Sequence, residues 1–139
     1  MQSLTNDLHK EVINMNVEEI QEKIDRLHYW DARVLMLACD YFADEVRLTY
    51  EDSNGNVNYI FNMCYNVEFK HNLKYCKMLP SRNLMRSQIP YFLQDVNVSC
   101  YEEEGIMLYK CTINMEPINL EILCKDIQIE KDEIRKENC

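Results

Sequence analysis

The chain contains few residues that force a backbone to turn or break. Its 139 residues include only 2 Gly and 3 Pro, so a Gly-rich phosphate-binding loop cannot form. No apolar run reaches the roughly 20 residues that a membrane-spanning helix needs. Residues 1–7 lack the basic start and apolar stretch of a signal peptide. These absences predict a cytoplasmic protein that does not insert into a membrane.

The sequence also lacks the spacings of metal and catalytic sites. A zinc site is typically built on Cys or His pairs two to four residues apart, and no such pair occurs. His71 and Cys76 come nearest. They could form a base and a nucleophile if the fold brought them together, or they are a loop histidine and a packing cysteine. Serine-hydrolase and metalloprotease motifs are absent. We therefore expect no catalytic residues, no metal, no cofactor and no enzymatic activity.

The cysteines do not follow the pattern of a disulfide framework. There are 7 of them, an odd number, and no two lie within ten residues of each other. Cys39, Cys64, Cys111 and Cys124 stand in apolar, strand-like stretches. Free cysteine packs as a small apolar side chain, so we expect these four to be reduced and to fill the core.

The charge balance is strongly acidic, with 15 Lys and Arg against 24 Asp and Glu and a net charge of −9. Such a surface repels nucleic acids and anionic membranes and attracts basic proteins, although simple solubility would also explain it. A basic connection departs from this balance and contains no acidic residue: Lys70, Lys74, Lys77, Arg82 and Arg86. It could dock on its own sheet, hold a phosphate or orient a partner.

One helix and six strands are predicted from the apolar periodicity. A helix capped by Asn16 carries one apolar stripe, and from Trp30 the period changes to two. The expected strands are Ala32–Cys39 (covered on both faces), 45–51, 57–69, 96–100, 107–115 and 118–129. Asp52–Asn56 supplies an Asn-Gly turn, the last strand has a bulge near Lys125–Asp126, and 71–91 is a connection.

These elements predict a single α+β domain over residues 1–139. The helix packs on a curved, mainly antiparallel sheet of about six strands, arranged as two three-stranded meanders. Leu4, Leu8 and Val12 permit a short helix within 1–15, and the charged residues 130–139 are expected to be a frayed tail.

Acidic side chains at predicted turns and strand edges are the candidate contacts for a protein partner. They are Asp44, Glu45, Glu51, Asp52, Glu102, Glu103 and Glu104. Tyr29 and Trp30 join this set, because aromatic residues dominate interface hot spots. The alternative for Trp30 is a structural one, in which the indole fills the seam between the helix and the sheet.

A short segment resembles a known group of bacterial proteins. The segment runs from Trp30-Asp31-Ala32-Arg33-Val34 through Glu45-Val46-Arg47-Leu48-Thr49-Tyr50-Glu51-Asp52. It is similar to small proteins that include immunity proteins of polymorphic or contact-dependent toxin systems. The resemblance implies a protein that binds and blocks a cognate toxin, commonly a basic nuclease, and it implies no catalytic residues. The basic connection departs from a uniformly acidic inhibitor.

We therefore expect a non-enzymatic protein-binding module, an immunity protein that neutralises a basic toxin domain. Two alternatives remain open. The first is a small-molecule-binding domain or small enzyme, with a pocket inside the sheet lined by Tyr59, Tyr65 and Tyr109 and with His71 or His28 as its polar group. The second is a self-assembling subunit that pairs through its strand edges.

Overall fold

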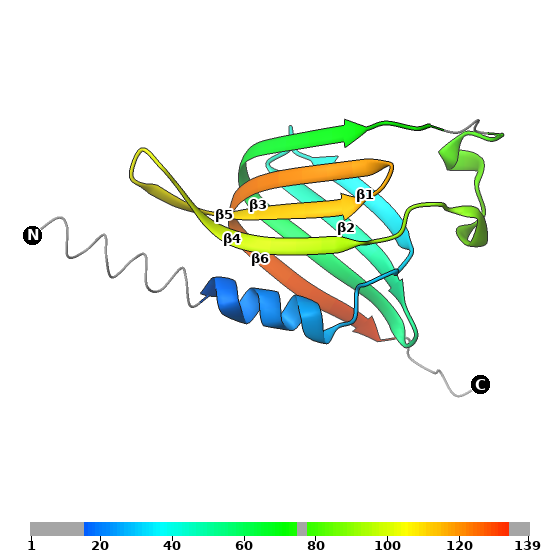
Figure 1. Cartoon of the computed structure of the whole chain (residues 1–139), viewed down its shortest axis with the longest axis horizontal. Helices are drawn as coiled ribbons and strands as arrows, with labels where there is room; N and C mark the ends of the chain where they lie inside the picture. Colours follow the sequence, from blue (N-terminus) through cyan, green and yellow to red (C-terminus); the bar gives the residue numbers. More distant parts are fainter. Residues whose placement is uncertain (1–15, 75–77, 134–139) are drawn as a thin grey trace, which may run out of the picture.

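The computed structural model describes residues 16–74 and 78–133. A helix occupies residues 16–26 and is followed by six strands (Figure 1). The strands are β1 (Val34–Asp40), β2 (Glu45–Asp52), β3 (Gly55–His71), β4 (Asp95–Glu103), β5 (Ile106–Met115) and β6 (Ile118–Glu133). The connection between β3 and β4 contains two short 3₁₀ helices, η1 (Ser81–Asn83) and η2 (Arg86–Gln88).

The strands form one sheet in the order β1-β2-β3-β6-β5-β4, with every neighbouring pair antiparallel. The sheet is open, with β1 and β4 at its edges. The predicted α+β class, with one helix and an antiparallel six-stranded sheet, is confirmed. The two longest strands, β3 and β6, bend as they cross the sheet (Figure 1). Since β2 pairs only with Gly55–Asn62, the second half of β3 extends beyond it.

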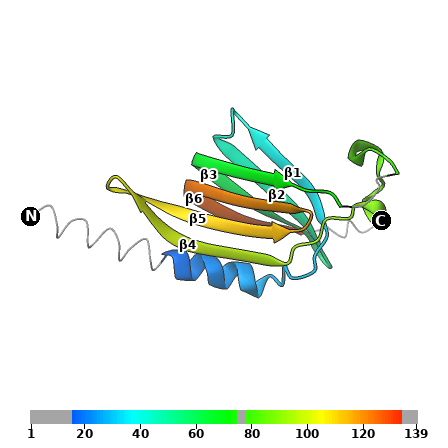
Figure 2. The same ribbon diagram turned by 45° about the horizontal axis from the view of Figure 1, so that its top comes forward.

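The helix lies along one face of the sheet and buries its apolar stripe there (Figures 1 and 2). Ile24 is fully buried in the core, with Val17, Ile20 and Leu27 packed beside it. Gln21 fixes the helix to the edge strand β4. Its Nε2 donates a 3.0 Å hydrogen bond to the carbonyl of Val96, and its Oε1 accepts a 2.7 Å bond from the amide of Val98.

Replacing Gln21 by alanine should lower the free energy of unfolding by about 1–3 kcal/mol, since it leaves the partly buried groups of Val96 and Val98 without a partner. Urea denaturation followed by circular dichroism measures the loss. Gln128→Ala is the matched control, because Gln128 is exposed on β6 and its removal should change stability by less than about 0.5 kcal/mol. Equal losses in the two variants would show that Gln21 does not clamp the helix.

The core is formed by the inner face of the sheet, and its three largest fully buried side chains are aromatic. Tyr50, Tyr59 and Phe61 are buried on the neighbouring strands β2 and β3. Tyr59 packs edge-on against both of the others, with ring centroids 5.4 Å from Tyr50 and 6.5 Å from Phe61. The Tyr50 hydroxyl donates to the carbonyl of Leu27, which ties the end of the helix to this core.

The first strand differs from its prediction. An apolar run was expected to be covered on both faces, but β1 is an edge strand in which only Val34 is fully buried. Residues 91–93 cover its beginning, since the amide of Val34 donates to the carbonyl of Tyr91. Met36 and Cys39 are exposed. An apolar run signals burial in general, but it does not distinguish a central strand from an edge.

Two details of the last strand also differ. The shift in register lies on β3, between Cys64 and Asn66, rather than at Lys125–Asp126 of β6. In addition, β6 continues to Glu133 in register with Gly55. Residues 130–133, predicted to belong to a frayed tail, are therefore strand. The possible helix within 1–15 and the tail residues 134–139 lie outside the described part of the chain.

Candidate functional site

The outer face of the first half of the sheet is acidic because side chains alternate along each strand. In β2 the residues Val46, Leu48 and Tyr50 are buried, so their neighbours point to the opposite face. The same alternation and the register of β1, β3 and β6 bring carboxylates together on that side. We call this surface the acidic face and define it by Asp40, Glu45, Glu51, Asp126, Glu130 and Asp132.

Neutral amides hold two of these carboxylates in place. Nδ2 of Asn62 donates a 3.1 Å hydrogen bond to Asp126, and Nδ2 of Asn58 donates a 2.8 Å bond to Asp132. The hydroxyl of Thr49 in turn donates to Oδ1 of Asn58 at 2.6 Å. These bonds fix the side chains without neutralising their charge, so the face keeps a negative potential.

Arg47 on β2 is a basic side chain that projects among these carboxylates. Its Nε lies 3.4 Å from Oε2 of Glu45. The hydrogen bond and charge of Glu45 raise the pKa of Arg47, with smaller contributions from Asp40 and Glu130. A single guanidinium thus interacts with several carboxylates at once, and it does not balance them. A surface with this pattern attracts cationic partners.

The predicted acidic contacts do not form one surface. Glu45 and Asp52 stand at opposite ends of β2 and, because they are seven residues apart, their side chains point to opposite faces of the sheet. Glu102 and Glu103 end β4, and Glu104 forms the turn into β5. That hairpin projects from a different end of the sheet (Figure 1). Of the predicted set, Glu45 and Glu51 belong to the acidic face.

Besides Glu45, two more of the predicted carboxylates are paired within the chain. Glu51 lies 2.9 Å from Nε of Arg86, and Asp52 lies 3.0 Å from Nζ of Lys131. Burial alone would raise the pKa of Asp52, but hydrogen bonds from Lys131 and from the amide of Ser53 lower it overall. These internal partners compete with any external cation. Asp44 is exposed in the turn before β2 and makes no ion pair within the described residues.

Several members of the acidic face were missed by the sequence analysis: Asp40, Asp126, Glu130 and Asp132. For the residues of β6, the sequence contains a signal: apolar and polar residues continue to alternate after Asp126. Ile127 and Ile129 are buried between polar neighbours. Assigning residues 130–139 to a tail ended the strand too early.

Tyr29 and Trp30 separate in the structure. Tyr29 is half-buried and packs against the core, whereas Trp30 is 71% exposed. Trp30 therefore does not fill the seam between the helix and the sheet, which was the structural alternative. An exposed indole is available to a partner, and Trp30 stays a candidate contact.

The basic connection docks on its own sheet through Arg86. Besides Glu51, Arg86 contacts Asn56, to whose Oδ1 its Nη2 donates a 3.2 Å hydrogen bond. Of the three roles predicted for the basic connection, this contact supports docking on its own sheet. Lys70 belongs to β3, and Lys77 lies outside the described residues.

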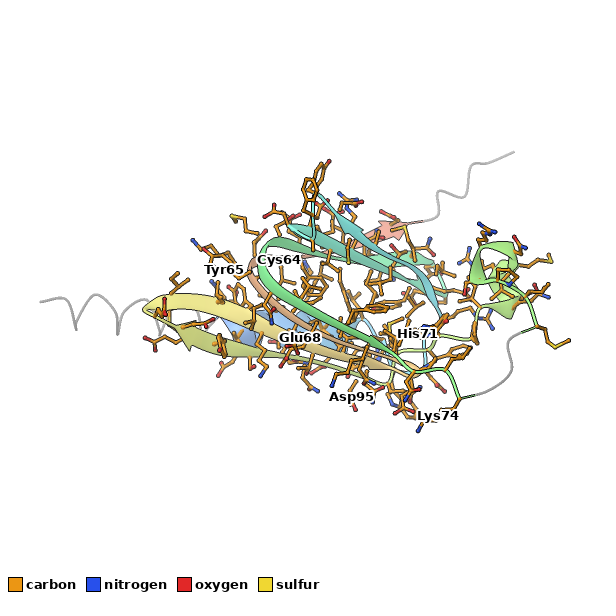
Figure 3. All side chains as sticks on the ribbon, turned by 90° about the horizontal axis from the view of Figure 1, so that it is seen from above. Cys64, Tyr65, Glu68, His71, Lys74 and Asp95 are labelled. Atoms are coloured by element: carbon orange, nitrogen blue, oxygen red, sulfur yellow. The ribbon has the colours of Figure 1, made fainter. Side chains whose placement is uncertain are left out.

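The tyrosines proposed to line an internal pocket do not assemble one. Tyr59 and Tyr109 are buried in the core, and Tyr65 is half exposed. An apolar groove of about 390 Å³ lies instead between β1, the end of β3 and the connection. His71 stands at this end of β3, far along the strand from Cys64 and Tyr65 (Figure 3). Its Nε2 lies 3.2 Å from the hydroxyl of Tyr91.

No cluster of three or more His, Cys, Asp and Glu side chains that could hold a metal ion occurs among residues 16–74 and 78–133. In the same ranges no helix is long and apolar enough to cross a membrane. Cys76, the proposed partner of His71, lies outside the described residues.

The described cysteines are free thiols in different surroundings. Cys111 and Cys124 are buried, Cys64 is half-buried and Cys39 is exposed. The prediction of core packing holds for the first two and is wrong for Cys39, because β1 is an edge strand. Burial raises the pKa of Cys64 to about 11 and that of Cys124 to about 12, and it also raises the pKa of Cys111.

Alkylation should therefore distinguish the described thiols. With iodoacetamide at pH 8 the thiolate is the reacting form, so the exposed Cys39 should react first and Cys111 and Cys124 last, by at least about tenfold in rate. Mass spectrometry of the native protein at timed intervals measures this order. Denaturation in urea should abolish the difference. Early modification of Cys124 in the native state would contradict its burial.

A small α+β domain whose outer sheet face is acidic has the features of a protein-binding module. A comparison with family models supports this class: the model for "Immunity protein PIM7" matches residues 16–131. The chain therefore belongs to the immunity protein PIM7 family, and the immunity-type resemblance of the Trp30–Asp52 segment is confirmed. Proteins of an immunity family act by binding a partner protein and are typically non-enzymatic. A search of curated proteins finds no match.

Proposed function

We propose that this protein binds and neutralises a cognate bacterial toxin, and that it does so as a non-enzymatic inhibitor in the cytoplasm. The observation that carries the proposal is the acidic face on a member of an immunity protein family. The toxin domain it fits is basic. Nucleic acids and anionic membranes are not its partners, because the same charge repels them.

Electrostatic attraction would act chiefly on the rate of encounter. Complementary charge can raise association rates well above those of neutral surfaces, and salt screens this effect. The hydrogen bonds from Asn62 to Asp126 and from Asn58 to Asp132 keep these carboxylates oriented before the partner arrives. Less side-chain ordering is then needed on binding, which favours affinity.

The proposal is tested by capture from a lysate of the source organism. The immobilised chain is washed at about 50 mM and then 500 mM salt, which changes the screening length from roughly 14 Å to 4 Å. Mass spectrometry identifies the retained proteins. We expect one basic protein that associates more slowly at high salt and that arrests growth when it is expressed alone. Retention of no protein, or only of proteins that are harmless on their own, would contradict the proposal.

A second candidate function is supported by the apolar groove. It has a volume of about 390 Å³ and combines apolar side chains with the His71–Tyr91 pair, which is the composition of many small-ligand sites. A thermal-shift screen of metabolites tests it. A reproducible rise in melting temperature that is lost in a variant such as Tyr91→Phe would favour ligand binding at the groove.

A further inference from the structure

The turn between β1 and β2 presents two aromatic rings to solvent. Tyr41 is 76% exposed, and Phe42 is as exposed as in an extended peptide, at 108%. Together with Ala43 these residues form what we call the aromatic turn. It stands out from the sheet on the side away from the helix (Figure 2). The rings are thus fully accessible to another molecule.

The conformation of the aromatic turn is unusual for these residue types. Tyr41, Phe42 and Ala43 all have left-handed backbone angles, with φ values of 53°, 58° and 66°. Residues with a Cβ enter this region at a cost in free energy, and runs of them are rare. Strain of this kind persists only where the surrounding structure imposes it, and it concentrates at functional sites.

Backbone contacts hold the aromatic turn from both sides. The amide of Asp44 donates a 3.1 Å hydrogen bond to the carbonyl of Tyr41, which closes the turn. The carbonyl of Asp44 accepts a 3.0 Å bond from the amide of Cys64 on β3. Below the turn, Asp40 pairs with Glu45 in the β1–β2 ladder. The backbone that carries the two rings is therefore held in place before binding, which lowers the entropy lost on binding.

The residues that flank the aromatic turn, Asp40, Asp44 and Glu45, are acidic. Asp40 and Glu45 lie directly opposite each other, and like charges in this position destabilise a sheet. Arg47 contacts Glu45, but neither Asp40 nor Asp44 forms a salt bridge within the described ranges. A cationic rim on a partner would relieve this repulsion. The turn therefore combines an apolar tip with an unbalanced acidic border.

We infer that Tyr41 and Phe42 are the anchor of the complex and insert into an apolar pocket bordered by Lys and Arg on the toxin domain. The inference rests on the proposed function and adds the residues on which affinity depends. Hot spots are enriched in large aromatic side chains, and near-neutral polar contacts surround them. The acidic face steers the encounter, and the aromatic turn then supplies the slow dissociation.

The test uses the basic protein that the wild-type chain retains from the lysate, purified after its identification. Its dissociation constant is measured by surface plasmon resonance for wild type, Phe42→Ala, Tyr41→Ala and Met85→Ala. Met85 is 69% exposed beside η2 and is the matched control. We expect Phe42→Ala to weaken binding at least about 30-fold, mainly through faster dissociation, since a hot-spot residue has an effect of this size. Met85→Ala should stay within about threefold, because Met85 lies outside the aromatic turn and its loss removes no charge from the acidic face.

The salt dependence of binding distinguishes the contribution of the aromatic turn from that of the acidic face. The loss in Phe42→Ala should persist at 500 mM salt, because apolar contact is not screened as surface charge is. The side chain is wholly exposed, so urea denaturation should give the wild-type midpoint, and Tyr41→Ala provides a second variant. Wild-type affinity in both aromatic variants would overturn the inference and leave the proposed function intact. Failure of the wild-type chain to bind any toxin would overturn both.

Discussion

Replacement of Phe61 by alanine is expected to lower the free energy of unfolding by about 3–5 kcal/mol, the range for deleting a large buried ring. Phe61 is 1% exposed on β3 and packs edge-on against Tyr59. The strand pairs with β2 on one side and β6 on the other, so the cavity would lie at the centre of the sheet. A domain of this size has a total stability of about 5–15 kcal/mol, so the variant should approach global unfolding at 37 °C.

Phe69→Ala is the matched control for this measurement. It removes the same side chain from the same strand, but Phe69 is 49% exposed. Its loss should cost about 1 kcal/mol, the average for a point substitution. Urea denaturation at 25 °C with a fluorescence and a circular dichroism signal gives both values. A loss in Phe69→Ala equal to that in Phe61→Ala would place the core elsewhere than on the inner face.

Charge reversal on the acidic face should reduce the rate of association with the proposed toxin domain by at least about tenfold at low salt. The variant Asp40→Lys/Glu130→Lys changes exposed residues on β1 and β6, and both act on Arg47 through their charge. The new lysines repel a basic partner. The lysine at position 40 lies opposite Glu45, so its charge is compatible with the sheet. Stopped-flow or surface plasmon resonance measures the rate across a salt series.

A second double reversal controls for net charge. Glu18→Lys/Glu19→Lys shifts the total charge by the same amount but lies on exposed positions of the helix, on the opposite face of the sheet. We expect a smaller reduction in rate, and the two variants should converge at high salt. If both reversals slowed association equally, the net charge of the chain would matter and the acidic face would have no special role.

The sheet could be predicted from the sequence where alternation is long and regular. The odd-numbered apolar residues from Val57 onward gave the first half of β3, and the Val46–Tyr50 pattern gave β2, because one buried face imposes a period of two. The helix followed from Ile20, Ile24 and Leu27 on one stripe. Both signals are local, so a single sequence contains them.

What could not be predicted depends on contacts between distant strands. Nothing local tells an edge strand from a central one, which is why β1 was expected to be covered on both faces. The acidic face can be predicted only when the register of β6 against β3 is known, for example that Asn62 lies opposite Asp126. The aromatic turn was missed for another reason. Its left-handed residues are Tyr, Phe and Ala, whereas turn signals rest on Gly, Asn and Asp.

The central claim is that the chain neutralises a toxin by binding it, and a growth-rescue assay tests this most directly. The basic protein retained from the lysate is expressed in a heterologous host alone, with the wild-type chain, or with the Asp40→Lys/Glu130→Lys variant carrying Phe42→Ala. Growth should stop with the toxin alone, resume with the wild-type chain and stay arrested with the triple variant at equal protein level. Continued arrest in the presence of the folded wild-type chain would contradict the account.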